Sequence, residues 1–204
     1  MAIILLCNIF IVIRRIVHIL LKDTDMPTSE FKKFLQRSCG SLWSVKRTQF
    51  NFPQLLEGGG KFLIVLPRNA ENLSSLSHWR ERLLFTIGSK EIIVLSIGVP
   101  LEYVQEWSGE YLFFTDSDIN SLGLASQRVI DAVKRHNFKI AFNLSADFDF
   151  ITAQIPLRAK IPFRMGIIED GLKNLGEKFF NITLQRSQQI DYENIAKLLS
   201  ANRT

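Results

Sequence analysis

Two aspartates, Asp147 and Asp149, are the residues of this sequence best suited to chemistry. They stand two positions apart, after the apolar run at 138–145 and beside a second apolar segment. Carboxylates at this spacing suit a general base for a sugar hydroxyl, or a cation site built from hard oxygen ligands. The structural alternative is that one of them caps a helix that begins near Phe148.

Further polar residues follow the apolar runs of the chain. In an open parallel sheet, ligands bind beyond the carboxyl ends of the strands, so residues directly after a predicted strand are candidates for binding. Asp116 and Asp118 lie near such a position. The planar guanidinium of an arginine there suits a phosphate or carboxylate, although a solvated loop arginine is the alternative. The candidate ligand-binding residues are Arg68, Asn69, Ser145 and Asp170.

Several common sites are not predicted. The segment 67–72 after the first apolar run has no glycine, so it forms neither a dinucleotide fingerprint nor a Walker loop. The three histidines lie on predicted helices without partner residues, and the two cysteines lack CxxC spacing. We therefore expect no metal and no cofactor. The sparse cysteines favour a reducing cytoplasm.

Alternating elements position these candidates. Apolar runs at 61–67, 91–98, 111–115, 138–145 and 163–168 predict buried strands, and 179–184 predicts an edge strand. Helical spacing of apolar residues at 71–87, 119–136, 148–157 and 190–201 predicts helices after them. Strands that alternate with helices predict an α/β domain at 61–204. We expect a doubly wound, mainly parallel sheet with helices on both faces.

The N-terminal segment 1–22 predicts an amphipathic helix. Its first apolar run is about a dozen residues, shorter than the roughly 20 that a spanning helix needs. On a helix, Arg14, Arg15 and Lys22 share one polar arc, so we expect them to contact anionic headgroups at the membrane surface. A helix docked on the domain is the alternative. Residues 23–60 read as a helical or irregular connector.

The charge balance of the chain also favours an anionic membrane surface as a partner. The chain of 204 residues carries 25 basic and 20 acidic residues, a formal net charge of +5. Without a recognised nucleic-acid motif, this excess favours an anionic membrane surface or an acidic ligand, and no nucleic acid is expected as a partner. The predicted location is cytoplasmic and peripheral on the inner membrane.

The sequences at 128–133, 138–144 and 161–167 resemble glycosyltransferase family 9, the ADP-heptose:lipopolysaccharide heptosyltransferases. In that family a helix leads into an "FDLAIDL"-like strand, and a further helix leads into a P-x-R-x-G strand. Here 138–144 reads Phe-Lys-Ile-Ala-Phe-Asn-Leu, and Pro162, Arg164 and Gly166 match the second motif. The resemblance covers about 61–184 and implies the N-terminal, acceptor-side Rossmann-like lobe of a GT-B glycosyltransferase.

The resemblance also implies differences from the full enzymes. The family's first loop carries an Arg-x-x-x-x-Gly-Asp-like segment whose aspartate is the proposed base, and 68–72 has neither that glycine nor that aspartate. Glu71 is the nearest carboxylate, although it does not match the motif, and it joins Asp147 and Asp149 as a candidate base. We expect the donor-binding second lobe to be absent, because the sequence ends where it would begin. GT-B transfer requires donor and acceptor to be held together between two lobes.

Two functions follow from this resemblance. The first is a single-lobe relative that acts in glycan- or lipopolysaccharide-related binding or scaffolding at the inner membrane, with a glycan or lipid-linked acceptor as ligand. The alternative is an active or split glycosyltransferase, in which a partner chain supplies the second lobe and a nucleotide sugar is the donor. Independently of the family, a doubly wound domain with an unrelated ligand is a third possibility.

Overall fold

The computed structural model describes residues 60–69, 73, 76, 80–81, 92–107, 110–168 and 172–185. All of them belong to the compact unit Cys39–Thr204. The predicted membrane helix at 1–22, most of the connector at 23–60 and the predicted helix at 190–201 lie outside the described residues. Among the described residues, no helix combines the length and hydropathy needed to cross a membrane.

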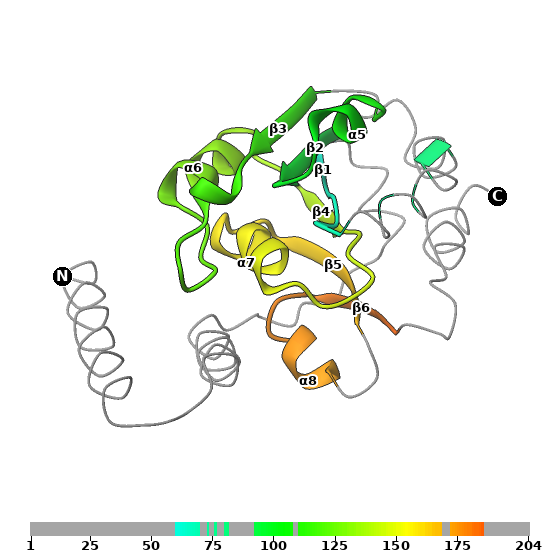
Figure 1. The fold of residues 1–204 in the computed structure, drawn as a ribbon. Coiled ribbons are helices and arrows are strands. Elements are labelled where there is room, and N and C mark those ends of the chain that lie inside the picture. Colours follow the sequence, from blue (N-terminus) through cyan, green and yellow to red (C-terminus); the bar gives the residue numbers. More distant parts are fainter. Residues whose placement is uncertain are drawn as a thin grey trace, which may run out of the picture. The chain divides into compact units, whose positions relative to one another are not determined.

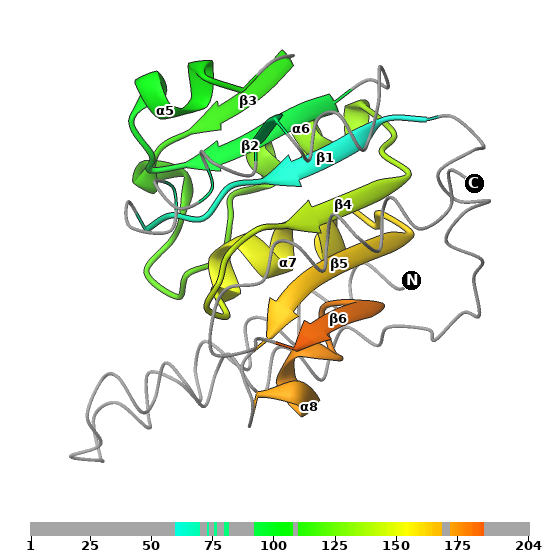
Figure 2. The same ribbon diagram turned by 90° about the vertical axis from the view of Figure 1, so that its right-hand side faces the viewer.

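Six strands form one sheet, as Figure 2 shows. Its spatial order is β3-β2-β1-β4-β5-β6, and every neighbouring pair is parallel. This is the order of a doubly wound α/β fold. The expectation of an α/β domain with a mainly parallel sheet is therefore confirmed. The strands are β1 (Phe62–Val65), β2 (Ile92–Ile97), β3 (Glu110–Phe114), β4 (Ile140–Asn143), β5 (Phe163–Ile168) and β6 (Ile182–Gln185).

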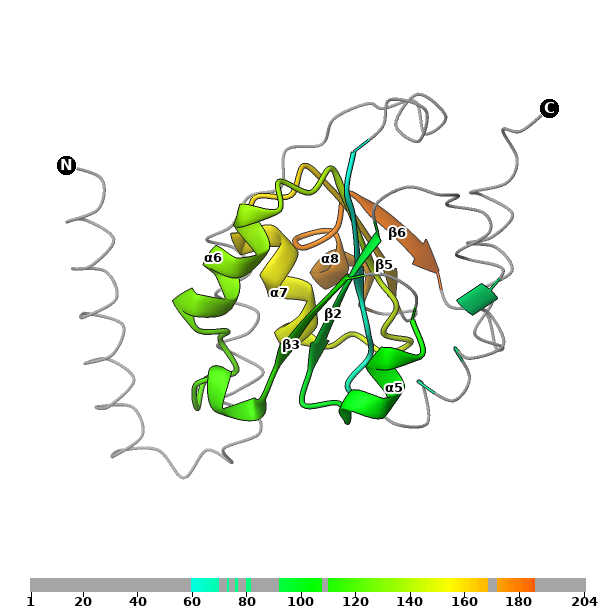
Figure 3. The ribbon, with the colours of Figure 1, turned by 90° about the horizontal axis from the view of Figure 1, so that it is seen from above.

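Helices lie on both sides of this sheet, as the view in Figure 3 shows. Helix α5 lies on one side, and α6 and α7 lie on the other. The described positions 73, 76, 80 and 81, between β1 and β2, are also helical. The elements are α5 (Leu101–Gln105), the 3-10 turn η1 (Asp116–Asp118), α6 (Gln127–Arg135), α7 (Phe150–Arg158) and α8 (Lys173–Gly176), labelled in Figure 1 where there is room.

The central strands are buried on both faces. In β1, Phe62 and Ile64 belong to the core on the α5 side, whereas Leu63 and Val65 belong to the core under α6 and α7. Successive side chains of a strand point to opposite faces, so burial of both faces requires a continuous apolar run. This requirement explains why the strands could be recognised from the sequence.

The Pro162, Arg164 and Gly166 motif has a structural role on β5. Arg164 is buried, donates from Nε to the Phe179 carbonyl at 2.9 Å, and also donates to the Ile161 carbonyl. Burial lowers the pKa of Arg164 to about 10, so the guanidinium stays protonated at neutral pH. The arginine thus ties β5 to the segment that precedes β6.

Some expected boundaries are wrong. The helix expected at 119–136 begins only at Gln127, because the Asn120 side chain accepts the N–H groups of Leu122 and Leu124 and closes a turn. Gly123 continues this turn with a φ of 77°, a value that favours glycine. The strand expected at 179–184 begins at Ile182, because the preceding aromatic residues pack in the core instead. Helices α5 and α8 were not predicted.

Candidate functional site

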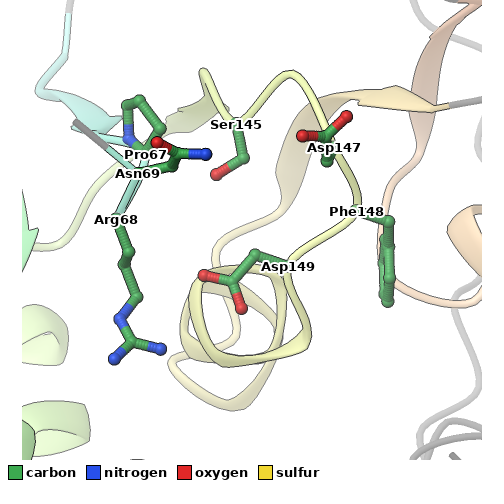
Figure 4. A pocket seen from close by; sticks show the side chains of 7 residues that line it. All are labelled: Pro67, Arg68, Asn69, Ser145, Asp147, Phe148 and Asp149. Carbon is green, nitrogen blue, oxygen red and sulfur yellow. The ribbon is translucent and has the colours of Figure 1, made fainter. Parts of the chain in front are cut away.

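The carboxyl ends of β1 and β4 border a pocket of about 360 Å³. These two strands are neighbours, but the chain continues from β1 to β2 on one side and from β4 to β5 on the other. The loops after them therefore diverge and leave a crevice between them. Figure 4 shows the residues that line the pocket: Pro67, Arg68, Asn69, Ser145, Asp147, Phe148 and Asp149.

Arg68 forms the β1 side of the pocket. Its Nη2 donates to Asp116 Oδ1 at 2.5 Å, and its side chain is 29% exposed. Gly98, at the end of β2, has a φ of +66°, and a Cβ there would lie 2.8 Å from Asp116 Oδ1. A side chain at position 98 would therefore crowd the Asp116 carboxyl in the position from which it contacts Arg68. The Nε of Arg68 is buried and has no hydrogen-bond partner among the described residues.

A hydrogen-bond network shapes the β4 side. Asn143 Nδ2 donates to Thr152 Oγ1 at 3.0 Å, and Thr152 Oγ1 donates to the Asp149 carbonyl at 3.1 Å. The Ser145 N–H donates to Asn143 Oδ1 at 3.0 Å, and the Ser145 and Thr152 hydroxyls lie 3.3 Å apart. These bonds satisfy buried polar groups in the loop from β4 to α7 and hold that loop in one conformation.

Asp149 is the N-cap of α7. Its Oδ1 accepts the Ile151 N–H at 3.0 Å, whereas its Oδ2 is buried without a hydrogen-bond partner among the described residues. Burial raises the pKa of Asp149, and this effect exceeds the opposing effects of the Ile151 N–H and the Arg68 charge. In Figure 4 the Asp149 carboxyl points toward the side of the pocket that holds Arg68.

Asp147 and Phe148 complete the wall. Asp147 lines the pocket from the loop, and the Phe148 ring packs against Phe179 and Phe180 with centroid distances of 5.4 and 6.5 Å. Phe148 therefore anchors the loop to the aromatic core rather than extending α7. The described residues contain no group of three or more His, Cys, Asp or Glu side chains that could hold a metal ion.

The structure brings together most of the residues singled out from the sequence. Arg68, Asn69, Ser145, Asp147 and Asp149 all line this pocket. Glu71 and Asp170 lie outside the described residues, as do Arg14, Arg15 and Lys22, so their predicted roles stay predictions.

Some contributors were not singled out. Pro67 and Phe148 were assigned to the first strand and to a helix, respectively, although both lie beside residues that were recognised as candidates. From the sequence, Asp116 was noted only as lying near the end of a predicted strand, whereas in the structure its carboxylate accepts a hydrogen bond from Arg68. Its neighbour Asp118 instead pairs with Arg128, with Nη2 to Oδ1 at 2.7 Å, and takes no part in the pocket.

A second pocket of about 270 Å³ lies at the opposite end of the strands. Lys134, Lys139 and Lys160 line it, close to the C-terminal ends of α6 and α7. Cations at this position complement the partial negative charge of helix C-termini. The lysines therefore have a structural explanation without a ligand.

The chemistry of the first pocket suits a hydroxylated ligand. A hydroxyl group donates one hydrogen bond and accepts others, so it can pair with both the donors and the acceptors of this lining. Asn69 and Ser145 add an amide and a hydroxyl to the lining. No protein-family model matches this sequence, and the comparisons with curated proteins and with solved structures found no match.

Proposed function

We propose that this chain is a single-lobe relative of the heptosyltransferase-type glycosyltransferases and that its pocket binds the sugar of a glycan or lipid-linked acceptor. Its role is glycan- or lipopolysaccharide-related binding or scaffolding on the cytoplasmic side of the inner membrane. The anionic membrane surface is its second partner, which Arg14, Arg15 and Lys22 contact, and it binds no nucleic acid.

The observation that carries the proposal is the mixed polar lining of the pocket at the carboxyl ends of β1 and β4. Arg68 supplies guanidinium donors, Asn69 an amide, Ser145 a hydroxyl, and Asp147 and Asp149 carboxylates. A sugar offers adjacent hydroxyl groups that donate and accept.

The alternative proposal is a split glycosyltransferase. A partner chain would supply the donor lobe, and Asp149 would act as the base that takes the proton of the acceptor hydroxyl. The raised pKa of this carboxyl favours that role, because a carboxylate with a higher pKa is a stronger base. Asp147 and Glu71 are the other candidates for the base.

Isothermal titration of the full chain tests the acceptor site that both proposals need. The ligand is a heptose-containing lipopolysaccharide core oligosaccharide. We expect saturable binding, and failure to bind it would contradict both proposals. A transfer assay separates the two proposals. Transfer of heptose from ADP-heptose to this oligosaccharide in an extract of the source cells, lost when the chain carries Asp149→Asn, would support the split glycosyltransferase instead of the binding protein.

Arg68→Lys tests the site itself. Lysine retains a positive charge opposite Asp116 but lacks the planar set of guanidinium donors. Loss of one hydrogen bond from a charged group should weaken oligosaccharide binding about 10-fold or more. Lys134→Ala, in the lysine-lined pocket at the other end of the strands, is the matched control and should bind as the parent does. Equal affinity of Arg68→Lys and the parent would refute this binding mode.

The membrane partner has a separate test. Deletion of residues 1–22 should move the protein from the membrane fraction to the soluble fraction, because it removes the predicted amphipathic helix. An unchanged distribution would refute the membrane proposal and leave the sugar-binding proposal intact.

A further inference from the structure

Strand β3 has an unusual outer edge. It is the last strand on its side of the sheet, and no described strand pairs with its outer edge (Figure 2). Edge strands are commonly protected by lysine, proline or a bulge, because they expose unpaired backbone N–H and C=O groups. The β3 sequence, Glu-Tyr-Leu-Phe-Phe, contains neither lysine nor proline.

Two aromatic residues of β3 are exposed to solvent. Tyr111 is 42% exposed and Phe113 is 38% exposed. In the register with β2 they lie opposite Val94 and Ser96, so both point to the face that α5 covers. Helix α5 adds exposed apolar residues of its own, Leu101 and Tyr103.

The same two residues direct their backbone groups outward. The Phe114 carbonyl accepts the Gly98 N–H at 3.0 Å, so the polar groups of Phe114 point toward the inside of the sheet. The direction alternates along a strand, and therefore Leu112 also points inward, whereas Tyr111 and Phe113 point to the free edge. Aromatic side chains and free backbone groups thus coincide at two positions of one short strand.

We propose that β3 pairs with β3 of a second copy of this chain, antiparallel, about a two-fold axis at Leu112. In this register Tyr111 lies opposite the partner subunit's Phe113, and Phe113 lies opposite the partner subunit's Tyr111. Both positions have outward backbone groups, so each opposed pair exchanges its N–H···O=C bonds in both directions. The two sheets become one continuous sheet.

Self-complementarity is the reason to identify the partner as a second copy. Each cross-strand pair joins a tyrosine to a phenylalanine on the same face, an arrangement that stabilises antiparallel strands. Glu110 lies opposite the partner subunit's Phe114, so the axis brings no like charges together. A two-fold interface requires such a surface to match itself. This inference does not depend on the proposed function of the pocket.

Charge-swap variants test this pairing in sedimentation experiments on the full chain. The first variant is Tyr111→Lys with Phe113→Lys, and the second is Tyr111→Glu with Phe113→Glu. Each variant alone places like charges opposite one another in both pairs and loses the aromatic contacts. We expect the dissociation constant of the dimer to rise by about 30-fold or more in each.

A mixture of the two variants should restore the dimer, because lysine then lies opposite glutamate at every position. Leu122→Lys, a substitution of a 38% exposed residue outside β3, is the matched control and should dimerise like the parent. Far-ultraviolet circular dichroism checks that every variant is folded. A parent that stays monomeric at all concentrations would overturn the proposal, as would a lysine variant that dimerises as tightly as the parent.

Discussion

Gly166→Ala is the substitution whose effect the structure determines most directly. Gly166 lies on β5 beneath the ring of Phe180, which is 4% exposed. A Cβ at position 166 would lie 2.4, 2.5 and 2.7 Å from three ring carbons of Phe180. Ordinary contact starts at 3.4 Å, so the ring must move by 1.0 Å, the difference between 3.4 and 2.4 Å.

Two opposing effects determine the magnitude. An extra carbon in a packed core costs about 1–3 kcal/mol, because interiors are dense and neighbours must leave their preferred rotamers. Replacement of glycine by alanine stabilises by about 0.4–1 kcal/mol through the lower entropy of the unfolded chain. The Phe180 ring packs near Phe148 and has little room to move. Overpacking should dominate, with a net loss of roughly 1–2 kcal/mol.

Urea denaturation measures this loss. With a slope of about 1–3 kcal/mol/M for small proteins, the midpoint should fall by roughly 0.5–1 M at an unchanged slope. Phe180→Leu in the Gly166→Ala background supplies the control, because a smaller side chain removes the clash. The double variant should lose less stability than the sum of the single variants, by about 1 kcal/mol. A Gly166→Ala midpoint equal to or above that of the parent would refute the reasoning, as would strict additivity.

Three further substitutions test charged groups of the fold. Asp149→Asn should stabilise the protein at neutral pH, because Asn caps helices as well as Asp and the cost of a buried carboxylate disappears. This gain in stability should vanish as the pH falls below the raised pKa of Asp149 toward 3.8, and a gain that persists in acid would contradict this cause. Arg164→Met should destabilise by about 2–5 kcal/mol in thermal or urea unfolding, because two buried carbonyls lose their donor; a loss below about 1 kcal/mol would contradict this role. Burial by itself would raise the pKa of Asp118, but hydrogen bonds from Arg128 and the Thr115 N–H lower this pKa overall. The ionised Asp118 carboxylate therefore stabilises the fold above pH 3.8, and this stabilisation is lost as the pH falls through the lowered pKa. Asp118→Asn should lower the free energy of unfolding by about 1 kcal/mol at neutral pH, a small value because Arg128 is largely exposed. An equal loss in strong acid would contradict the stabilising role of the ionised carboxylate.

Most of the sheet could be predicted because each central strand carries its own signal. Both faces of β1, β2 and β4 are buried, so each strand had to be a continuous apolar run. The residues after these runs could be named as candidates for the same reason, since parallel strands bring their carboxyl ends to one edge. The start of α6 was missed because Asn120 and Gly123 close a turn within an apolar pattern that also fits a helix.

The sequence by itself determined the class of fold and the residue types that follow the strands, because local hydrophobic pattern and turn residues encode both. The tertiary structure alone decided which of those residues meet. The strand order places β1 beside β4, and this neighbourhood brings Arg68 and Asp149 to one pocket although they are far apart in the chain. Burial then raises the pKa of Asp149 and leaves one of its oxygens unpartnered. The same strand order makes β3 an edge strand. Which side chains are buried, which residues meet and which strands pair depend on neighbours in space, and these are not neighbours in the sequence.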